Sequence, residues 1–284
     1  MLWINGALCP LDVARISPLD RGFTLGDGLF ETIRVRAGEP VHLPAHLHRL
    51  AAGGQVLGLA VPGADTVRAG IMELLAATSV RDGSVRLTVA RGEGPRGLLP
   101  PTETAPTCTM VATTGHFGRS DVRALTSRLI RRDEASPLSR IKSLNYLPAI
   151  LARQEAARAG LDEAVLLNIA GRVAETTISN LVVAHDGHVF TPPVSEGALP
   201  GTARGSLITA GLLQEASLTV EQLRRAQGVC LDNSLSLRAW PEPARAGIAV
   251  DSQRTPRPAV FLHCRSSRSC RPYLASCPAA CPSC

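Results

Sequence analysis

The sequence contains few aromatic residues, almost no lysine and no long uncharged apolar run. Aromatic side chains make up 3% of the 284 residues. Surfaces that bind nucleic acids combine basic patches with stacking aromatics, so the net charge of +6 does not by itself indicate such a partner. No segment resembles a signal peptide or a membrane-spanning helix. We therefore expect a cytoplasmic protein with no nucleic-acid partner and no membrane partner.

The scarcity of lysine draws attention to the one that is present. Of the 30 lysine and arginine residues, Lys142 is the single lysine. Arginine replaces lysine wherever only a positive charge is needed, but it stays protonated and is a poor nucleophile. A lysine amine can lose its proton when it is desolvated and can then condense with a carbonyl group. Lys142 is therefore a candidate nucleophile, and a lysine left by chance is the alternative.

The cysteines are distributed unevenly. Three lie in the body of the chain, as is typical of buried thiols, and the other five crowd the region 239–284, which is also rich in Pro, Ser and Arg. We expect this tail to be poorly ordered, and one hypothesis is a translation that has shifted out of the ancestral reading frame. Alternatively, His263 and the tail cysteines could bind zinc, which would make the protein a binding module and not an enzyme. The spacing matches no paired Cys-x-x-Cys finger, so we expect no metal ion.

Hydrophobic periodicity predicts a chain of mixed helices and strands. The pairs Asn5-Gly6, Ala37-Gly38 and Asp186-Gly187 indicate tight turns between strands. The predicted helices cover residues 44–57, 65–77, 145–159, 201–213 and 220–225. The predicted strands cover residues 2–4 (at a sheet edge), 29–35, 84–90, 108–113, 125–131, 162–168, 173–184 and 228–231.

Six motifs in a fixed order carry the strongest functional signal. They are RGFTLGDGLFETIR at 21–34, HLHRL at 46–50, RGEGPRG at 91–97, RIKSLNYL at 140–147, VAETTISNL at 173–181 and LPGTAR at 199–204. This order resembles the class IV aminotransferases, also called fold type IV pyridoxal 5'-phosphate (PLP) enzymes. The family includes branched-chain and D-amino acid transaminases and aminodeoxychorismate lyase. The resemblance extends from about residue 3 to about residue 237.

The resemblance implies a PLP cofactor and assigns three residues to it. Lys142 is implied to be the Schiff-base lysine and proton carrier, and Glu175 to pair with the pyridine nitrogen. A carboxylate there keeps the nitrogen protonated, so that the ring can accept electrons from the substrate. Arg49 is implied to anchor the phosphate, a role that suits its bidentate fork.

Further residues are implied to contact the cofactor. Gly201 and Thr202 lie at the start of a predicted helix, where free backbone amides attract phosphate. Relatives often carry threonine at the position of Ala203, so this chain is expected to lack one phosphate hydroxyl. Tyr146 resembles a family tyrosine near the phenolic oxygen, and a core aromatic is the alternative. Two more residues are expected to hydrogen-bond around the cofactor, or else to be structural: Asn180 and Ser234.

Two residues bear on the reaction itself. Thr32 is at a position where the lyases tend to carry a catalytic threonine, and Arg96 is a candidate for binding the substrate carboxylate, or else a solvated loop charge. Gly97 and Leu98 follow Arg96, whereas a D-amino acid transaminase would favour an Arg-x-His pair in this loop. We predict a 4-amino-4-deoxychorismate lyase that forms 4-aminobenzoate and pyruvate. A branched-chain or D-amino acid transaminase is the alternative.

The resemblance also implies the architecture. We expect an α+β fold with a small α/β domain at residues 1–118 and a larger, β-rich pseudo-barrel domain at residues 119–238, followed by the tail. A homodimer with its sites near the interface, acting on a small-molecule amino substrate, is expected from the same family.

Overall fold

The computed structural model describes residues 1–115, 117, 121–185 and 187–240. The chain forms two compact units, and each is assembled from separate parts of the sequence. The first unit comprises Met1–Gly118, Glu134–Pro148 and Leu199–Thr202, and the second comprises Arg119–Asp133, Ala149–Ala198 and Ala203–Cys284. The first unit therefore contains the segment around Lys142, although this segment follows the start of the second unit in sequence.

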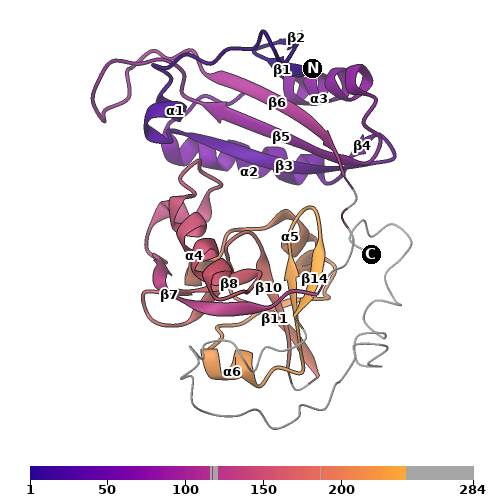
Figure 1. Cartoon of the computed structure of the whole chain (residues 1–284), viewed down its shortest axis with the longest axis vertical. Coiled ribbons are helices and arrows are strands. Elements are labelled where there is room, and N and C mark those ends of the chain that lie inside the picture. Colours follow the sequence, from indigo (N-terminus) through magenta and orange to yellow (C-terminus); the bar gives the residue numbers. More distant parts are fainter. Residues whose placement is uncertain (116, 118–120, 186, 241–284) are drawn as a thin grey trace. The chain divides into compact units, whose positions relative to one another are not determined.

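The first unit is built on one antiparallel sheet of six strands, in the order β2-β1-β6-β5-β3-β4 (Figure 1). The predicted turns join neighbouring strands, because Asn5-Gly6 and Ala37-Gly38 all have positive φ angles, as a type I′ hairpin turn requires. The strands are β1 (Leu2–Ile4), β2 (Ala7–Cys9), β3 (Gly28–Arg36), β4 (Glu39–Pro40), β5 (Gly83–Ala90) and β6 (Thr107–Thr114).

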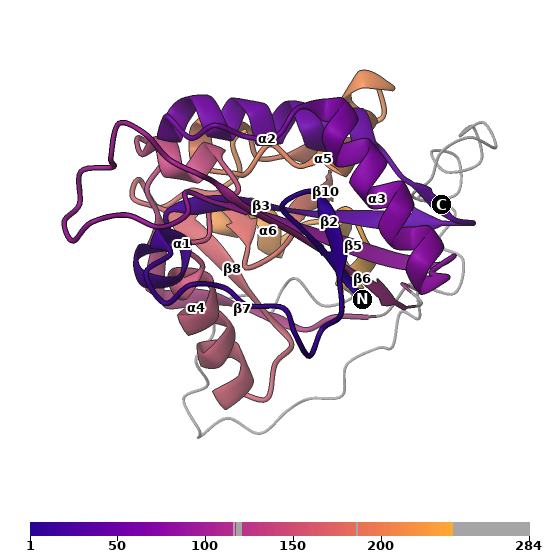
Figure 2. The same ribbon diagram turned by 90° about the horizontal axis from the view of Figure 1, so that it is seen from above.

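Two helices, α2 (Leu43–Leu57) and α3 (Ala64–Thr78), pack on this sheet (Figures 1 and 2). Strand alternation places Ile33 and Leu87 in the core that the helices cover. Glu31 has the same strand parity as Ile33 and therefore points toward the helices. Phe30 and Thr32 consequently lie on the opposite face of β3. A short helix, α1 (Arg21–Leu25), precedes β3.

The second unit contains a five-stranded sheet, in the order β12-β11-β10-β13-β14, and a three-stranded sheet, β7-β8-β9. Strands β7 and β8 are parallel, and Ala152 and Ala156 of helix α4 cluster with Ala164 and Leu166 of β8. The strands are β7 (Ala124–Arg132), β8 (Glu163–Asn168), β9 (Val173–Thr176), β10 (Asn180–His185), β11 (His188–Thr191), β12 (Gln214–Glu215), β13 (Gly228–Asp232) and β14 (Leu237–Trp240). The helices are α4 (Leu147–Arg158), η2 (Val194–Glu196), α5 (Thr202–Thr209) and α6 (Val220–Arg224). The first residues of α4 and α5 belong to the first unit, as does the short helix η1 (Pro137–Arg140).

The structure corrects four predicted elements. The predicted strand 173–184 is two strands, because the backbone amide and hydroxyl of Thr176 both donate to the Ser179 carbonyl and close a turn. The helix expected at 201–213 ends at Thr209, and the one expected at 145–159 begins at Leu147. The strand 2–4 is not at the sheet edge, because β2 pairs with its outer side.

The predicted tail and its zinc hypothesis fall almost entirely on residues 241–284, which lie outside the described residues. Within the described ranges, no group of His, Cys, Asp and Glu side chains is arranged to hold a metal ion. In the same part of the chain, no helix has the length and apolar character needed to span a membrane.

Candidate active site

Lys142 is held against the beginning of β3. The Phe30 amide donates to the Lys142 carbonyl at 2.9 Å, and the Leu144 amide donates to the Gly28 carbonyl at 3.0 Å. These bonds fix the backbone on both sides of the lysine. Its amine donates to the Tyr146 hydroxyl at 3.0 Å, so two residues that the sequence predicted lie side by side.

The ring of Phe30 packs against this amine. The Lys142 amine lies 4.4 Å from the centroid of the Phe30 ring, and the Tyr146 ring meets Phe30 edge-on at 4.9 Å. The guanidinium carbon of Arg86 lies 3.4 Å from the same centroid. Arg86 is paired with Thr32 across strands β5 and β3, so the predicted catalytic threonine belongs to the same face.

Arg86 was not among the residues predicted from the sequence. Its signal was the alternation of the predicted strand 84–90, in which Val85, Leu87 and Val89 are buried and Arg86 points the other way. The alternation shows that the Arg86 side chain points away from the core. It does not reveal that β5 pairs with β3 in the register that sets Arg86 beside Phe30.

On the helix side of β3, Glu31 forms a buried cluster with two residues of α2. Arg49 donates to both carboxylate oxygens at 2.8 and 2.6 Å, and His46 Nδ1 lies 2.6 Å from Oε2. Burial alone would raise the pKa of Glu31, but the hydrogen bonds and charges of Arg49 and His46 outweigh it and hold the pKa below its ordinary value. Glu31 is therefore an ionised carboxylate that orients Arg49.

The same cluster reaches the start of α5. Arg49 Nη1 donates to the Pro200 carbonyl at 3.0 Å, and the Thr202 hydroxyl lies 3.4 Å from His46 Nε2. Gly201 lies between these two contacts in sequence. The residues predicted to bind phosphate from two distant segments are thus adjacent, and Ala203 follows as the second residue of α5.

Arg49 keeps donors available for an anion. A guanidinium carries five N–H groups, and the bonds to Glu31 and Pro200 use one on each of its three nitrogens. The two that remain, together with the backbone amides at the start of α5, form a donor set that fits a phosphate group.

In the second unit, Glu175 lies on β9 and is buried. Arg132 Nε lies 3.0 Å from its Oε1 and also donates to the Gly197 carbonyl at 3.0 Å. An arginine at this distance favours the ionised carboxylate, the form that can pair with a protonated ring nitrogen. Glu175 is therefore chemically suited to its predicted role.

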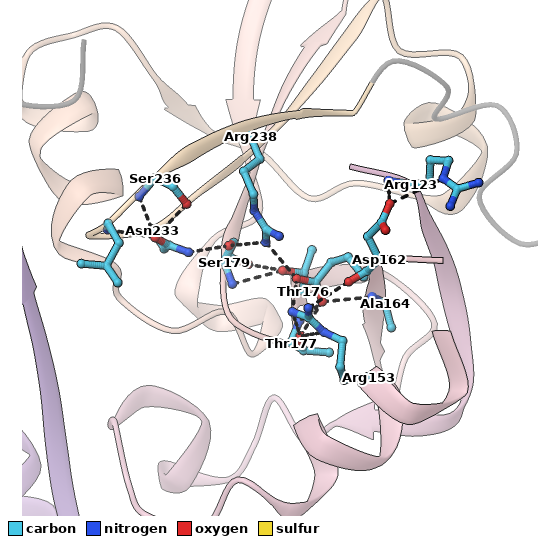
Figure 3. Close-up of polar contacts among 12 residues, drawn as sticks. Arg123, Arg153, Asp162, Ala164, Thr176, Thr177, Ser179, Asn233, Ser236 and Arg238 are labelled. Carbon is cyan, nitrogen blue, oxygen red and sulfur yellow. Dashed lines mark hydrogen bonds and ion pairs between the residues drawn. The ribbon is translucent and has the colours of Figure 1, made fainter. Parts of the chain in front are cut away.

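The turn that follows Glu175 is held by a second buried carboxylate, Glu163 of β8. Glu163 accepts hydrogen bonds from Arg153 at 2.5 Å, from Arg238 at 3.0 Å and from the Thr177 hydroxyl. Figure 3 shows Arg153 and Arg238 converging on the turn that carries Thr177 and Ser179. One carboxylate thus fixes the segment between Glu175 and Asn180.

The β13–β14 turn, which carries Ser234, is tied to the same network. The Asn233 amide donates to the Ser179 hydroxyl at 3.0 Å, and its side-chain oxygen accepts from the amides of Leu235 and Ser236 (Figure 3). The network therefore links the predicted residues Asn180 and Ser234 through Ser179, the residue before Asn180.

Arg96 lies elsewhere, on an exposed loop of the first unit. Two buried arginines, Arg21 and Arg91, donate to Asp27, and Arg21 also donates to the carbonyls of Gly97 and Leu98 at 2.9 and 2.8 Å. This network fixes the backbone of the loop and leaves the Arg96 side chain in solvent.

The family model for class IV aminotransferases matches residues 28–239. The chain is 35% identical over 212 residues to the "Putative branched-chain-amino-acid aminotransferase" of Methanocaldococcus jannaschii, covering 73% of each protein. The chain belongs to the class IV aminotransferase family. It is a PLP-dependent enzyme with the α+β architecture of fold type IV, as the sequence predicted.

Two solved structures resemble the chain closely. The 4-amino-4-deoxychorismate lyase of Pseudomonas aeruginosa is 30% identical, with a TM-score of 0.68 over 84% of this chain and 90% of the other. The branched-chain aminotransferase of the archaeon Thermoproteus uzoniensis, solved with norvaline, is 25% identical, with a TM-score of 0.79 over 88% of this chain and 89% of the other. Both activities thus occur among its relatives.

Proposed function

We propose that the protein is a 4-amino-4-deoxychorismate lyase. The proposal rests on the position of Thr32. Its side chain lies on the same sheet face as Phe30, and it pairs with Arg86 on the neighbouring strand. The Phe30 ring in turn supports the Lys142 amine. The 30% identity to a solved lyase structure supports this assignment.

The chain offers a residue for each part of PLP. Lys142 would hold the aldehyde, with Tyr146 beside the phenolic oxygen. Glu175 would pair with the ring nitrogen, and Asn180 and Ser234 would lie around the cofactor. The phosphate would be bound by Arg49 and by the backbone of Gly201, Thr202 and Ala203. The donor sets fit, because they comprise one lysine amine, an ionised carboxylate and N–H groups of an arginine and a helix start.

The proposed reaction needs a base and a hydrogen-bond donor. Bound PLP supplies an electron sink for the carbon that carries the substrate amine. The Lys142 amine removes the proton from this carbon. The Thr32 hydroxyl donates to the ether oxygen of the substrate as its bond to the ring breaks. The departing enolpyruvate takes up the proton that Lys142 removed and becomes pyruvate, and the loss of this proton and of the ether bond leaves the ring aromatic, as 4-aminobenzoate.

Substrate trials test the assignment directly. We expect the PLP-loaded protein to form 4-aminobenzoate and pyruvate from 4-amino-4-deoxychorismate. The alternative, a branched-chain or D-amino acid transaminase, is supported by the 35% identity to the M. jannaschii protein. It predicts keto acids from L-leucine or D-alanine with 2-oxoglutarate. Keto acid without 4-aminobenzoate would refute the lyase proposal.

Paired variants test the two residues named in the reaction. Lys142→Arg keeps the charge but removes the nucleophile, so we expect both the visible absorbance of bound PLP and turnover to disappear. Thr32→Val removes one hydroxyl and should lower kcat by about 100-fold, the usual scale of proton-transfer assistance. Thr88→Val is the matched control, since Thr88 pairs with Phe30 on the same face. Equal losses in the two threonine variants would contradict the role of Thr32.

We also propose that the enzyme is a cytoplasmic homodimer. Three large apolar side chains in the first unit, Phe23, Leu98 and Leu99, are 76%, 83% and 86% exposed in the single chain, and a second copy would cover them. Light scattering should give a dimer mass, and Leu98→Asp combined with Leu99→Asp should shift it toward the monomer. A monomeric wild-type enzyme would contradict the proposal. Arg96 lies on the same loop, and its proposed role in binding the substrate carboxylate would then depend on this assembly.

A further inference from the structure

We propose that Arg132 is a positioning residue that holds the carboxylate of Glu175 where it can pair with the ring nitrogen of PLP. The inference rests on the proposed role of Glu175 and deepens it. It names the side chain that fixes this carboxylate, and it names the short helix, η2, that holds the side chain in turn.

Arg132 and Glu175 lie on the two outer strands of one small sheet, which has the order β7-β8-β9. Across this sheet, Glu175 pairs with Leu166 of β8, and Arg132 pairs with Asn168 of the same strand. Side chains two residues apart on a strand project from the same face of a sheet. The pairing therefore brings the guanidinium across β8 to the carboxylate, where Arg132 Nε lies 3.0 Å from Glu175 Oε1.

A backbone carbonyl holds the same guanidinium from η2. Arg132 Nε donates to the Gly197 carbonyl at 3.0 Å, so one N–H group lies within reach of two acceptors. Gly197 ends η2 with a φ of 91°, a left-handed conformation that favours glycine. A rotation of the Arg132 side chain away from Gly197 would also weaken its contact with Glu175.

The helix η2 is itself anchored by Glu196, the residue before Gly197. The Glu196 carboxylate is buried and accepts from the Asn168 side chain at 2.5 Å and from Arg172 at 2.6 Å. Asn168 is also the β8 residue with which Arg132 pairs. The strand β8 thus sets both the position of the arginine and the position of the carbonyl that holds it.

A purely structural role for Arg132 predicts something different. If this arginine only ties η2 to β7, its loss should weaken every cofactor that fits the site to the same extent. If it holds Glu175 for the ring nitrogen, the loss should fall on a cofactor that carries this nitrogen. The analogue 1-deaza-PLP separates the two roles, because a carbon replaces the ring nitrogen while the aldehyde, phenolic oxygen and phosphate remain.

The test compares the dissociation constants of PLP and 1-deaza-PLP, measured by fluorescence titration of the full chain freed of cofactor. The constant for the analogue divided by that for PLP gives the preference for the ring nitrogen. We expect Arg132→Gln to lower this preference about tenfold, because a displaced carboxylate makes a poorer charge-assisted hydrogen bond. Adding Arg132→Gln to Glu175→Gln should lower it no further.

Arg131→Gln is the matched control. Arg131 is the neighbouring residue on β7, and it donates to the carbonyls of Ser127 and Ile130 in its own strand. The preference for the ring nitrogen should therefore stay unchanged in this variant. Glu196→Gln provides a second route that leaves Arg132 in place. It weakens the anchor of η2 and should lower the preference about threefold, and it decides the proposal if Arg132→Gln does not fold.

Two results would overturn the proposal. One is an equal loss of affinity for both cofactors in the Arg132 and Glu196 variants, and the other is a fall in Arg131→Gln as large as that in Arg132→Gln. If Glu175→Gln abolishes the preference while Arg132→Gln retains it, only the role of Arg132 has failed. If Glu175→Gln leaves the preference unchanged, the proposed role of Glu175 has failed.

Discussion

In each unit, one buried carboxylate holds residues of the candidate site in place. The partners of the two carboxylates differ in how far they are exposed to solvent. Glu31 and both its partners are closed off, with side-chain exposures of 1% for Glu31, 1% for His46 and 9% for Arg49. Glu163 is as buried as Glu31, yet its partners Arg153 and Arg238 remain 35% and 17% exposed. Exposed arginines can turn to solvent when their partner is lost, whereas enclosed ones cannot.

The difference also determines which residues each carboxylate positions. Glu31 orients Arg49 and the start of α5 from within a regular sheet. Glu163 instead holds an irregular turn, through Thr177, and leaves the flanking Glu175 and Asn180 at strand ends. The first unit thus derives its geometry from strand pairing, and the second derives it from side-chain hydrogen bonds.

The largest effect should follow from Glu31→Gln. It leaves Arg49 and His46 enclosed without a counter-charge, and we expect a loss of about 3–5 kcal/mol in the free energy of unfolding, measured by urea denaturation. Because the folded pKa of Glu31 is lowered, its contribution is present above the carboxyl's unfolded value and disappears as the pH falls through the lowered pKa. The gap between wild type and variant should therefore narrow in acid. A gap that widens in acid would contradict this assignment.

Glu163→Gln should lower the free energy of unfolding by less, about 2–3 kcal/mol, because water can hydrate Arg153 and Arg238 when their partner is lost. The turn after Glu175 should loosen, so PLP affinity should also fall, as followed by fluorescence titration. Glu155→Gln is the control, since Glu155 accepts from the Ser127 hydroxyl and a backbone amide and no cofactor-binding segment depends on it. A loss of unfolding free energy equal to that of Glu31→Gln would show that the solvent exposure of the arginine partners makes no difference.

The same contrast explains which features were predictable from the sequence. Alternation in 29–35 and 84–90 predicted β3 and β5, and the motif order indicated Lys142, Glu175 and Arg49. The family and its cofactor were confirmed, whereas the residue roles remain predictions. The alternating pattern of these strands is visible in the sequence because each buried position in a paired strand needs an apolar side chain.

Features that depend on distant partners were not predictable. The break at residues 177–179 interrupts a run of β-forming residues, and it depends on Glu163, Arg153 and Arg238, which are far away in sequence. The contact of Arg86 with Phe30 likewise depends on the register of β5 against β3. Local propensity carries no information about such partners.

Asp232 provides a further test within the second unit, because it is a buried carboxylate with one oxygen that finds no hydrogen-bond partner. Burial raises its pKa to about 7. The folded protein therefore binds more protons than the unfolded chain between about pH 4 and pH 7, and this group lowers stability as the pH rises through that window. We expect Asp232→Asn to stabilise the protein by on the order of 2 kcal/mol at pH 8 and by much less at pH 5. A variant destabilised at pH 8 would indicate that the carboxylate is needed in its charged form.

The smallest loss of unfolding free energy should come from breaking an ion pair that is exposed to solvent. This pair shows how little a fully hydrated carboxylate–arginine contact contributes. Arg225 and Glu221 lie 2.7 Å apart at the end of α6, with side-chain exposures of 74% and 57%. Arg224 also approaches Glu221, at 3.9 Å, so Arg225→Gln leaves the carboxylate with a partner. Hydration and this second arginine should limit the loss to about 0.5 kcal/mol, and 1 M salt should abolish it. A loss as large as that of Glu163→Gln would mean that solvent exposure does not govern the strength of these clusters, and the contrast between Glu31 and Glu163 would need another cause.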